Sequence, residues 1–307
     1  MPLLSVVTPF YNCRNHLPAM LASLSAQTMT DFEAIFIDDA SDDGGADVIT
    51  KHGDKRCRII RNTANLGNAS ARNRGMSTAA DSGFVAVFDA DDIAHPQRFE
   101  KQLGFLSRRP EISACGTFLV DVYPDEVTRH SIRECDPASV AAQAMFKIPI
   151  AHTTCIFRRE IFDREGFAYD EETRTGLRCK DYDLMNRLIV AGKALANLPE
   201  FLMRKRIHTT SVTFASLPRA FAGNIRARRH LFERLGLVDD PRMDVHHRLC
   251  NWLEWPECPP PPNFPVADWF AAIISANDAV NIFDRAPLSS FLDQVLASIE
   301  RRPFAQT

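Results

Sequence analysis

The stretch Phe-Val-Ala-Val-Phe-Asp-Ala-Asp-Asp, residues 84–92, decides the fold of this 307-residue chain. Its first five residues form a continuous apolar run, which is typical of a strand buried on both faces of a parallel sheet. The run ends abruptly at Asp89, and further carboxylates follow at Asp91 and Asp92. In open α/β sheets, ligands bind beyond the carboxyl ends of the strands. The stretch therefore predicts a buried strand with an acidic site at its carboxyl end.

Strand and helix patterns alternate before this stretch. Short apolar runs at residues 3–9, 32–38 and 58–61 predict three more strands. Leucine and methionine recur at i, i+3, i+4 and i+7 in residues 17–24, which predicts a helix after the first strand, and small residues at 68–80 predict another. This alternation predicts an α/β fold with a mainly parallel sheet flanked by helices.

The rest of the chain predicts a second half and a helical extension. A helix follows Pro96, less regular strands occupy residues 110–215, and a further helix is expected at 180–191. The four-proline run 259–262 reads as a linker, followed by two more helices. We therefore expect a core domain at 1–215, with halves at 1–108 and 109–215, and a helical C-terminal extension at 216–307.

The charge of the chain is nearly balanced, with 36 basic and 39 acidic side chains and a formal net charge of -3. This balance argues against nucleic acid as a partner, because binding to phosphates needs an excess of Lys and Arg. One segment departs from the balance, since residues 203–236 hold eight Lys or Arg and one acid, Glu233. A basic helix at 219–235 is therefore a candidate for peripheral contact with an anionic membrane, with a solvated helix face as the alternative.

No stretch of the sequence predicts export or membrane insertion. The N-terminal residues lack the long apolar segment of a signal peptide, and no uncharged apolar run approaches the roughly 20 residues that span a bilayer. The apolar stretch 266–283 is interrupted by charges and predicts packed core or an oligomer surface. We expect a cytoplasmic protein, in contact with the inner face of a membrane if the basic helix binds lipid.

The acidic strand end has the chemistry of a metal site. Asp89 and Asp91 stand at i and i+2, so their side chains point the same way and can share one hard cation. Mg²⁺ or Mn²⁺ held by one or two carboxylates completes its shell with water and phosphate oxygens, which implies a diphosphate ligand. A solvated surface turn is the alternative for an Asp-rich loop.

Four motifs in the first 100 residues resemble the family 2 glycosyltransferases of the GT-A fold. They are Ser-Val-Val-Thr-Pro-Phe-Tyr-Asn at 5–12, Asp-Asp-Ala-Ser-Asp-Asp-Gly at 38–44, Asn-Leu-Gly at 65–67 with Ala-Arg-Asn-Arg-Gly at 71–75, and the Asp-Ala-Asp-Asp motif with Pro96. The resemblance continues more loosely to about residue 214. It implies an inverting, metal-dependent transferase that moves a sugar from a UDP-sugar to an acceptor hydroxyl in the synthesis of a surface glycan, such as lipopolysaccharide, exopolysaccharide or capsule.

The resemblance also assigns the nucleotide-sugar site. Thr8, Pro9 and Tyr11 would line the nucleotide pocket. Asp39 would accept a hydrogen bond from the uracil imide, and Arg72 would donate to a uracil carbonyl, roles that suit an acceptor and a donor side chain. Asp89 would lie beside the ribose and the metal, and Asp91 would bind the metal. The alternative for Arg72 is a surface salt bridge.

An inverting transfer needs one carboxylate to take the proton of the acceptor hydroxyl. In the family this carboxylate stands in a Glu-Asp pair at the start of a helix, and Lys180-Asp181 matches that pair here. Asp181 is therefore the candidate base, with Asp183 and Glu172 in reserve. Lys180 departs from the family pattern, and a neighbouring cation tends to weaken a carboxylate base. A helix cap without chemistry is the alternative for Asp181.

Two histidines complete the predicted site by resemblance. His208 lies in Arg-Ile-His, similar to the Arg-x-His segment with which the family completes the metal shell or contacts the diphosphate. His152 lies where the acceptor, a glycan or lipid-linked glycan, is often held. Both assignments compete with a structural role, which is common for a lone histidine.

Two other functions stay open at the level of sequence. A nucleotidyltransferase can share the nucleotide-binding sheet and a metal aspartate, but it normally has a Gly-rich phosphate loop after the first strand, where this chain has Pro-Phe-Tyr-Asn-Cys at 9–13. A non-catalytic sugar-nucleotide-binding relative is the other alternative, which the Lys180 departure allows.

Overall fold

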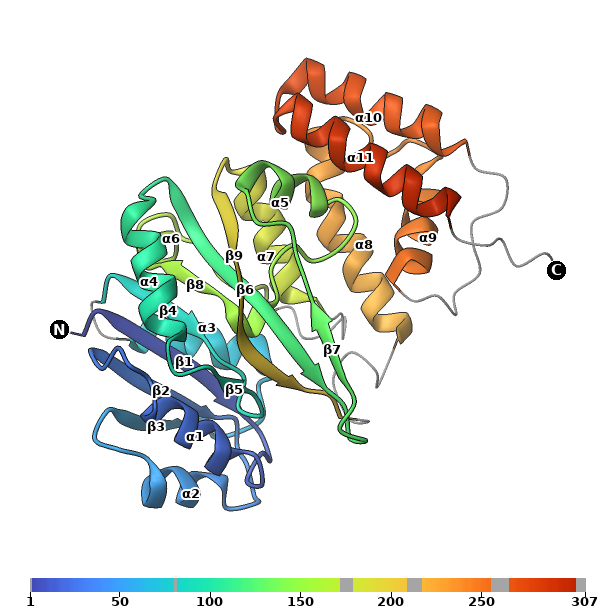
Figure 1. The fold of residues 1–307 in the computed structure, drawn as a ribbon. Helices are drawn as coiled ribbons and strands as arrows, with labels where there is room; N and C mark the ends of the chain where they lie inside the picture. The colour runs from blue at the N-terminus through green and yellow to red at the C-terminus, as the bar shows by residue number, and fades with distance from the viewer. Residues whose placement is uncertain (1, 80–81, 172–178, 209–216, 255–264, 302–307) are drawn as a thin grey trace.

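The computed structural model describes residues 2–79, 82–171, 179–208, 217–254 and 265–301. Within these residues nine strands form one curled sheet that helices cover, and α8 to α11 gather at one end of the molecule (Figure 1). The strands are β1 (Leu4–Phe10), β2 (Phe32–Asp38), β3 (Cys57–Arg61), β4 (Phe84–Val87), β5 (Ile93–Ala94), β6 (Ile112–Val122), β7 (Thr128–Ser131), β8 (Ile156–Arg158) and β9 (Ala194–Arg206).

Helices alternate with the strands in the first half and dominate the end of the chain. They are α1 (Leu17–Ser25), α2 (Gly45–His52), α3 (Asn68–Thr78), α4 (Arg98–Arg108), α5 (Pro137–Gln143), the 3₁₀ turn η1 (His152–Thr154), α6 (Glu160–Asp163), α7 (Lys180–Val190), α8 (Leu217–Arg234), α9 (Met243–Glu254), α10 (Val266–Val280) and α11 (Arg285–Glu300).

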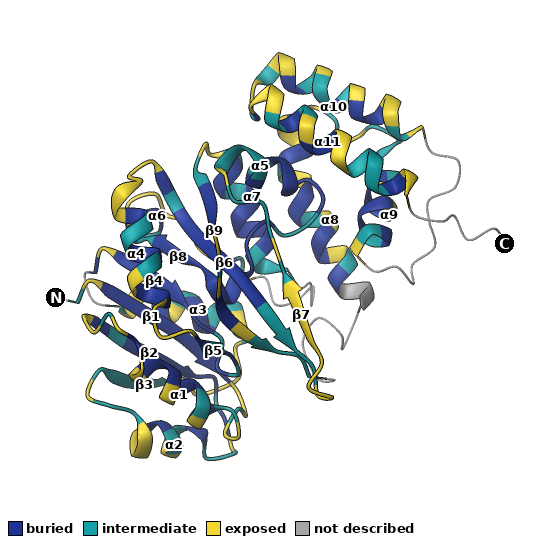
Figure 2. Cartoon of the chain, in the orientation of Figure 1, coloured by how far each residue is buried: buried dark blue, intermediate teal, exposed yellow. Residues whose placement is uncertain are grey.

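Strands β1, β2 and β4 are buried on both faces, whereas β3 at the edge of the sheet is half-buried. Along β4, Val85 and Val87 belong to one hydrophobic core, and Phe84 and Ala86 belong to another. Alternate side chains of a strand point to opposite faces, so the two cores lie on opposite sides of the sheet. This explains the continuous apolar run at 84–88, and Figure 2 shows the same strands as buried.

The order of the strands confirms the predicted α/β sheet and refines its second half. Neighbours β3, β2, β1 and β4 are parallel, as predicted. Beyond them β8 pairs antiparallel with both β4 and β6, and β9 returns parallel to β6. The sheet as a whole is therefore mixed, with the parallel part in the first half of the chain.

Four helices were not predicted from the sequence, namely α2, α5, α6 and α9. Helix α2 is short, and Ile49 is its one large buried apolar side chain. Helix α9 turns buried histidines, His246 and His247, toward the core. The apolar stripe on which helix prediction rests is reduced to one large side chain in α2, and in α9 it is interrupted by the two histidines.

The C-terminal helices share a core with the sheet. Helix α8 packs against α7, and α11 packs against α5. Leu231 of α8 and Trp269 of α10 belong to the same hydrophobic core as Val85 of β4. The division of the chain at residue 215 stays a prediction from composition, since this core is continuous across it.

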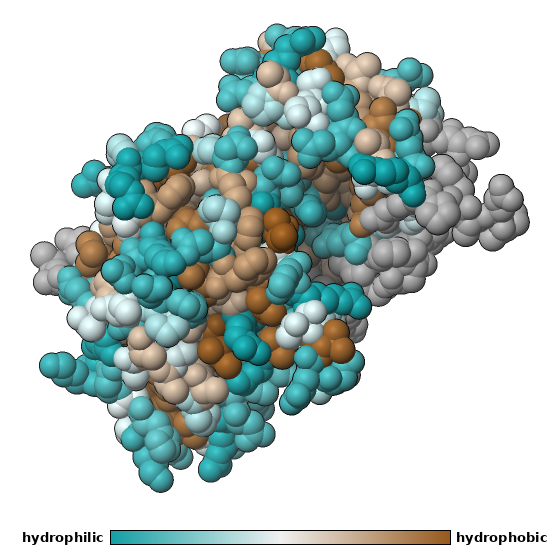
Figure 3. Space-filling model, viewed as in Figure 1, coloured by the Kyte–Doolittle hydropathy of each residue, from teal (hydrophilic) through white to brown (hydrophobic). Residues whose placement is uncertain are grey.

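The surface differs between the middle and the ends of the molecule. Figure 3 shows apolar surface over the region of β6, β7 and β9, where Val127, Ile132 and Phe201 are exposed. Among the residues that the structure describes, no helix combines the length and the apolar character of a membrane span.

Candidate active site

The carboxyl ends of four strands meet at one edge of the sheet. Strands β2 and β4 lie parallel to β1 on its two sides, so their polar ends at 38–43 and 89–92 lie beside the end of β1. Strand β9 reaches the same edge, where the backbone N–H of Arg206 donates to Asp92 Oδ1 at 3.1 Å. The convergence predicted from the sequence is confirmed, and β9 brings the segment with His208 into it.

Asp39 holds the loop that forms one side of this edge. Its Oδ1 accepts hydrogen bonds from Asn62 Nδ2 at 2.6 Å and from the backbone N–H of Leu66 at 3.0 Å. Its Oδ2 accepts from the backbone N–H of Gly67 at 2.8 Å. A carboxylate offers about four acceptor positions, and three of those of Asp39 are occupied by these hydrogen bonds. The expected contact of Asp39 with an imide N–H stays a prediction.

A cavity lies beside this loop. It has a volume of about 500 Å³ and is lined by Asn65, Leu66, Gly67, Ser70 and Glu171. Gly67 has a φ of +86°, a backbone conformation that glycine adopts without strain. The Asn-Leu-Gly motif at 65–67 therefore shapes the wall of a cavity next to the Asp39 carboxylate.

The three residues predicted to line the nucleotide pocket, Thr8, Pro9 and Tyr11, differ in how exposed they are. Thr8 is fully buried in the strand, and Pro9 is buried as well. Tyr11 follows the strand and exposes about half of its surface, 49%. Tyr11 is therefore the member of the three that is open to a ligand in this structure, and the nucleotide contacts of Thr8 and Pro9 stay predictions.

Arg72 and Asp89 form an ion pair at the centre of the edge. Arg72 lies on α3, is 7% exposed, and donates from Nη2 to Asp89 Oδ1 at 2.6 Å. Burial raises the pKa of Asp89, but Arg72, His152 and Lys205 together outweigh burial and leave the pKa below its ordinary value. The salt bridge considered as the alternative for Arg72 is thus present, but it is buried at the site and not on the surface. A hydrogen bond from Arg72 to a uracil carbonyl stays a prediction.

Asp91 and His208 come together across the edge, as predicted for a shared metal. His208 Nε2 lies 3.5 Å from Asp91 Oδ2. Burial and the charge of Asp89 raise the pKa of Asp91, and the same causes raise the pKa of Asp92 well above its ordinary value. Burial and the repulsion between neighbouring carboxylates therefore both disfavour the ionised forms of Asp91 and Asp92.

These residues fit a divalent cation. In the described part of the chain no three His, Cys, Asp or Glu side chains are grouped to hold a metal, so Asp91 and His208 would be the protein ligands. Magnesium and manganese are commonly held by one or two protein groups, with phosphate and water oxygens in the other positions. A cation here would favour the ionised form of Asp91, which burial and the charge of Asp89 disfavour. An imidazole nitrogen favours Mn²⁺ over Mg²⁺, which prefers oxygen ligands.

Asp181 lies in the first turn of α7, next to the ion pair of Arg72. Its Oδ1 accepts from the backbone N–H of Tyr182 at 3.0 Å. Its charge is close enough to raise the pKa values of Arg72 and His152. The candidate base therefore faces the same edge as the nucleotide-sugar residues.

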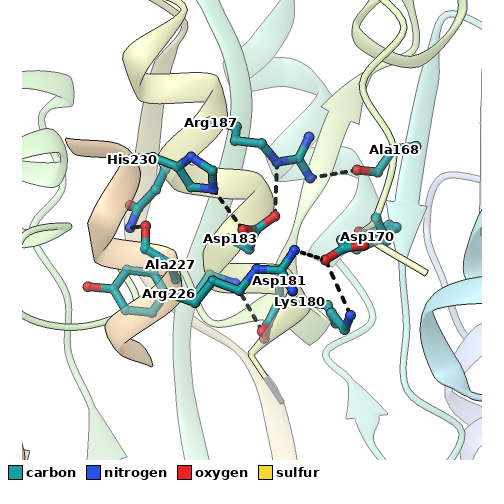
Figure 4. A network of polar contacts seen from close by, with 12 residues as sticks. Ala168, Asp170, Lys180, Asp181, Asp183, Arg187, Arg226, Ala227 and His230 are labelled. Carbon is teal, nitrogen blue, oxygen red and sulfur yellow. Dashed lines mark hydrogen bonds and ion pairs between the residues drawn. The ribbon is translucent and has the colours of Figure 1, made fainter. Parts of the chain in front are cut away.

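The neighbours of Asp181 are engaged with other groups (Figure 4). Lys180 Nζ lies 3.5 Å from Asp170 Oδ2, and Arg226 of α8 pairs with the same oxygen. Asp183, held in reserve as a base, is buried and bound by Arg187 Nε at 2.9 Å and by His230 Nε2 at 2.8 Å. Glu172, the other reserve, lies outside the described residues.

His152 is buried beside Asp89. Its Nε2 makes a 2.8 Å hydrogen bond with the Tyr169 hydroxyl, and burial lowers its pKa to about 4. A neutral, buried ring fits a residue that shapes the site. Direct contact between His152 and an acceptor stays a prediction.

Several residues of the site were missed at the level of sequence. The His16 ring contacts that of His208 in a tilted arrangement with centroids 4.6 Å apart, and its Nδ1 accepts from Arg206 Nη1 at 3.1 Å. Asn73 binds the backbone of Tyr169 from both sides of its amide. Asn73 falls within the motif at 71–75, but no local pattern distinguishes His16 or Tyr169.

Comparison with known proteins gives a family match and relatives that are similar in sequence. The family model described as Glycosyl transferase family 2 matches residues 5–166. The uncharacterized glycosyltransferase MJ1057 of Methanocaldococcus jannaschii is 30% identical over 215 residues, which is 67% of this chain and 71% of that protein. The amylovoran biosynthesis glycosyltransferase AmsE of Erwinia amylovora is 30% identical over 150 residues, 48% of this chain and 53% of AmsE.

Solved structures share the fold at low sequence identity. TarS of S. aureus in complex with UDP-GlcNAc matches with a TM-score of 0.64 and 16% identity, covering 98% of this chain and 92% of that chain. The mannosyltransferase PcManGT of Pyrobaculum calidifontis, in complex with GDP-Man and Mn²⁺, matches with a TM-score of 0.56 and 16% identity, covering 99% and 82%. The fold is thus that of GT-A transferases, including the C-terminal helices.

Proposed function

This chain belongs to glycosyl transferase family 2, and we propose that it is an inverting transferase that moves a sugar from a UDP-sugar to an acceptor hydroxyl in the synthesis of a surface glycan. The observation that carries the proposal is the meeting of Asp91 with His208 beside the Arg72–Asp89 pair. It combines two candidate metal ligands with neighbouring carboxylates whose mutual repulsion a bound cation would relieve, and the same cation could bind the oxygens of a diphosphate.

The donor side of the proposal rests on the Asp39 loop. The open position on Asp39 Oδ2 suits the imide N–H of uracil, and the cavity at 65–67 lies next to it. TarS, which shares the fold, was solved with UDP-GlcNAc, and this supports UDP. PcManGT was solved with GDP-Man, so GDP is the competitor that an experiment must test.

The proposed reaction needs one proton transfer by the chain. The acceptor oxygen forms a bond to the anomeric carbon while the bond from that carbon to the diphosphate oxygen breaks. The hydroxyl proton passes to the Asp181 carboxylate as the bond forms. A bound Mn²⁺ or Mg²⁺ would supply positive charge for the leaving diphosphate.

The rest of the edge would hold the donor in place. Arg72 fixes the orientation of Asp89 for the ribose, because its guanidinium is buried and bonded to that carboxylate. His152 and Tyr169 bond to each other and fill the wall between Asp89 and the acceptor half. These contacts hold the proposed reacting groups before the substrates arrive.

A peripheral membrane contact through residues 219–235 remains part of the proposal. Fewer basic side chains of this helix are available for lipid than the sequence suggests, because several are buried or paired within the chain. Arg228 is fully buried and donates to the backbone carbonyl of Phe146 at 2.6 Å. Arg226 pairs with Asp170, and Arg229 pairs with Glu233. A lipid-linked glycan acceptor would bring the enzyme to the cytoplasmic face of a membrane, and co-sedimentation with anionic vesicles at low salt tests this contact.

Thermal unfolding with nucleotides tests the donor and the metal together. We expect UDP-sugars with Mn²⁺ to raise the melting temperature, since a ligand at about 100 times its Kd adds about 2.7 kcal/mol to stability. GDP-mannose with Mn²⁺ serves as the matched competitor, and EDTA should remove most of the shift. Slow release of UDP without an acceptor should accompany binding. No shift with any UDP-sugar, or a larger shift with GDP-mannose, would contradict the proposed donor.

A further inference from the structure

Lys180 sits directly before the proposed base, where the family usually has Glu. Lys180 and Asp181 are consecutive residues in the first turn of α7, and the lysine side chain is long and flexible, so an ammonium group released from its partner could turn to the Asp181 carboxylate. A salt bridge between them would occupy the carboxylate that must receive the acceptor proton. The chain therefore needs another anion to hold Lys180, and this inference rests on the proposed role of Asp181.

Asp170 provides that anion. Its Oδ2 lies 3.5 Å from Lys180 Nζ, and the side chains of Asp170 and Lys180 are 24% and 19% exposed. Arg226 of α8 pairs with the same oxygen. Figure 4 shows Lys180 and Arg226 both directed at Asp170. Partial burial strengthens such contacts over those of exposed pairs.

The backbone around Asp170 is fixed on both sides, through a segment that we call the strap, residues 168–171. Asn73 of α3 accepts from the backbone N–H of Tyr169 at 2.9 Å and donates to its carbonyl at 2.8 Å. Arg187 of α7 donates to the carbonyl of Ala168 at 2.6 Å. The strap is thus tied to the helix that carries Arg72 and to the helix that carries Asp181.

The strap also reaches the interior of the site. The Tyr169 ring is buried, and its hydroxyl bonds to His152. Asp170 follows Tyr169, so its carboxylate cannot move far without breaking these contacts. A fixed carboxylate orients a flexible lysine better than a mobile one, because less side-chain freedom is lost in each contact.

We propose that Asp170 is a positioning residue: its fixed carboxylate holds the Lys180 ammonium and thereby keeps Asp181 available for the proton of the acceptor hydroxyl. Arg226 shares Asp170 and ties α8 to the same point. Lys180-Asp181 then takes the place of the Glu-Asp pair that the family usually has, and the carboxylate of Asp170 in the strap binds the lysine.

A double-mutant cycle tests this positioning role. The four proteins are the wild type, Asp170→Asn, Lys180→Met and the double variant, each assayed for UDP release from UDP-GlcNAc and for the nucleotide-induced shift in melting temperature. We expect Asp170→Asn to lower kcat about 10-fold or more with little change in KM, since Lys180 then turns to Asp181. Lys180→Met alone should stay within about 3-fold of wild type, and the double variant should return to that level.

The rescue separates positioning from a merely structural role. A double variant as slow as Asp170→Asn, or slower, would overturn the inference, because Lys180 no longer carries an ammonium group that could pair with Asp181. Glu165→Gln is the matched control, since it removes a similarly exposed pair with Lys193 at 2.6 Å and should leave kcat unchanged. If Asp170→Asn fails to fold, Asp170→Glu decides, with retained turnover expected and lost turnover contradicting the role.

The same assay distinguishes this inference from the proposed function. Wild-type protein without a nucleotide-induced shift and without UDP release contradicts the proposed function, and the inference with it. Wild-type release together with an unrescued double variant contradicts the inference alone.

Discussion

Two segments of this chain read Asp-x-Asp, and their surroundings differ in charge. Asp89-Ala-Asp91 follows β4, and Asp181-Tyr-Asp183 lies in the first turn of α7. In the first, Arg72 pairs with Asp89, while the pKa of Asp91 is raised by burial and by the charge of Asp89. In the second, Asp183 is bound by Arg187 and His230, which outweigh burial and lower its pKa.

The difference shows that the same residue pattern can specify opposite chemistry. Excess negative charge at the end of β4 suits a cation that arrives from outside the chain. The pair on α7 is balanced by side chains of the chain itself, which leaves Asp181 as the carboxylate directed at the site. Three predictions test this contrast, from the largest expected effect to the smallest.

Asp181→Asn should separate the two carboxylates of α7 most clearly. An amide cannot take a proton at the pH of the reaction, so we expect kcat to fall by about 10²–10⁴-fold while the nucleotide-induced shift in melting temperature is kept. Steady-state UDP release and thermal unfolding measure both quantities.

Asp183→Asn is the matched control for this change. It should spare turnover and lower the free energy of unfolding by about 1–3 kcal/mol, because Arg187 and His230 lose a buried partner. Loss of turnover in Asp183→Asn, with full activity in Asp181→Asn, would exchange the two roles.

Loss of a paired carboxylate usually lowers the stability of a protein, and we expect Asp91→Asn not to do so. We expect the melting temperature without metal to stay the same or rise, since the change removes excess negative charge from the β4 loop. The Mn²⁺-dependent part of nucleotide binding should weaken by at least about 10–100-fold. Losses of that size already follow when a residue that only hydrogen-bonds to a metal ligand is mutated.

Titration calorimetry with UDP, with and without Mn²⁺, measures this effect. Asp239→Asn, which removes an exposed carboxylate, is the control and should change neither quantity. An Asp91→Asn protein that binds UDP and Mn²⁺ as the wild type does would remove Asp91 from the metal site.

The first half of the site could be predicted because its residues follow strands. The strand predicted at Phe32–Asp38 has the same bounds in the structure. The apolar run before Asp89 predicts a buried strand, which is β4. Once the strands are known to be parallel, their carboxyl ends must meet. The pairing of Asp91 with His208 was expected from a motif resemblance and needed no further knowledge of side-chain packing.

The second half could not be predicted in the same way, because its contacts join distant segments. Asn73 and Tyr169 are 96 residues apart, and Arg206 and His16 are 190 apart. Charge counting marked helix α8 as a basic surface, yet Arg228 is buried against a carbonyl. Periodicity identifies the apolar face of a helix, but it does not identify the partner of a polar side chain.

The smallest expected effect is the pH dependence of the Asp183 contacts. The pKa of Asp183 lies below its ordinary value of 3.8, so folding favours the ionised carboxylate. The stability that it contributes is therefore present at neutral pH and is lost as the pH falls through the lowered pKa.

Urea unfolding of the wild type and Asp183→Asn from about pH 7 to about pH 2.5 measures this contribution. The difference in the free energy of unfolding between the two proteins should stay level down to about pH 5 and shrink below about pH 4. A difference that persists at the acid end would mean that Arg187 and His230 bind the protonated side chain as well as the carboxylate. The balance of charge on α7 would then not be what distinguishes it from the β4 loop.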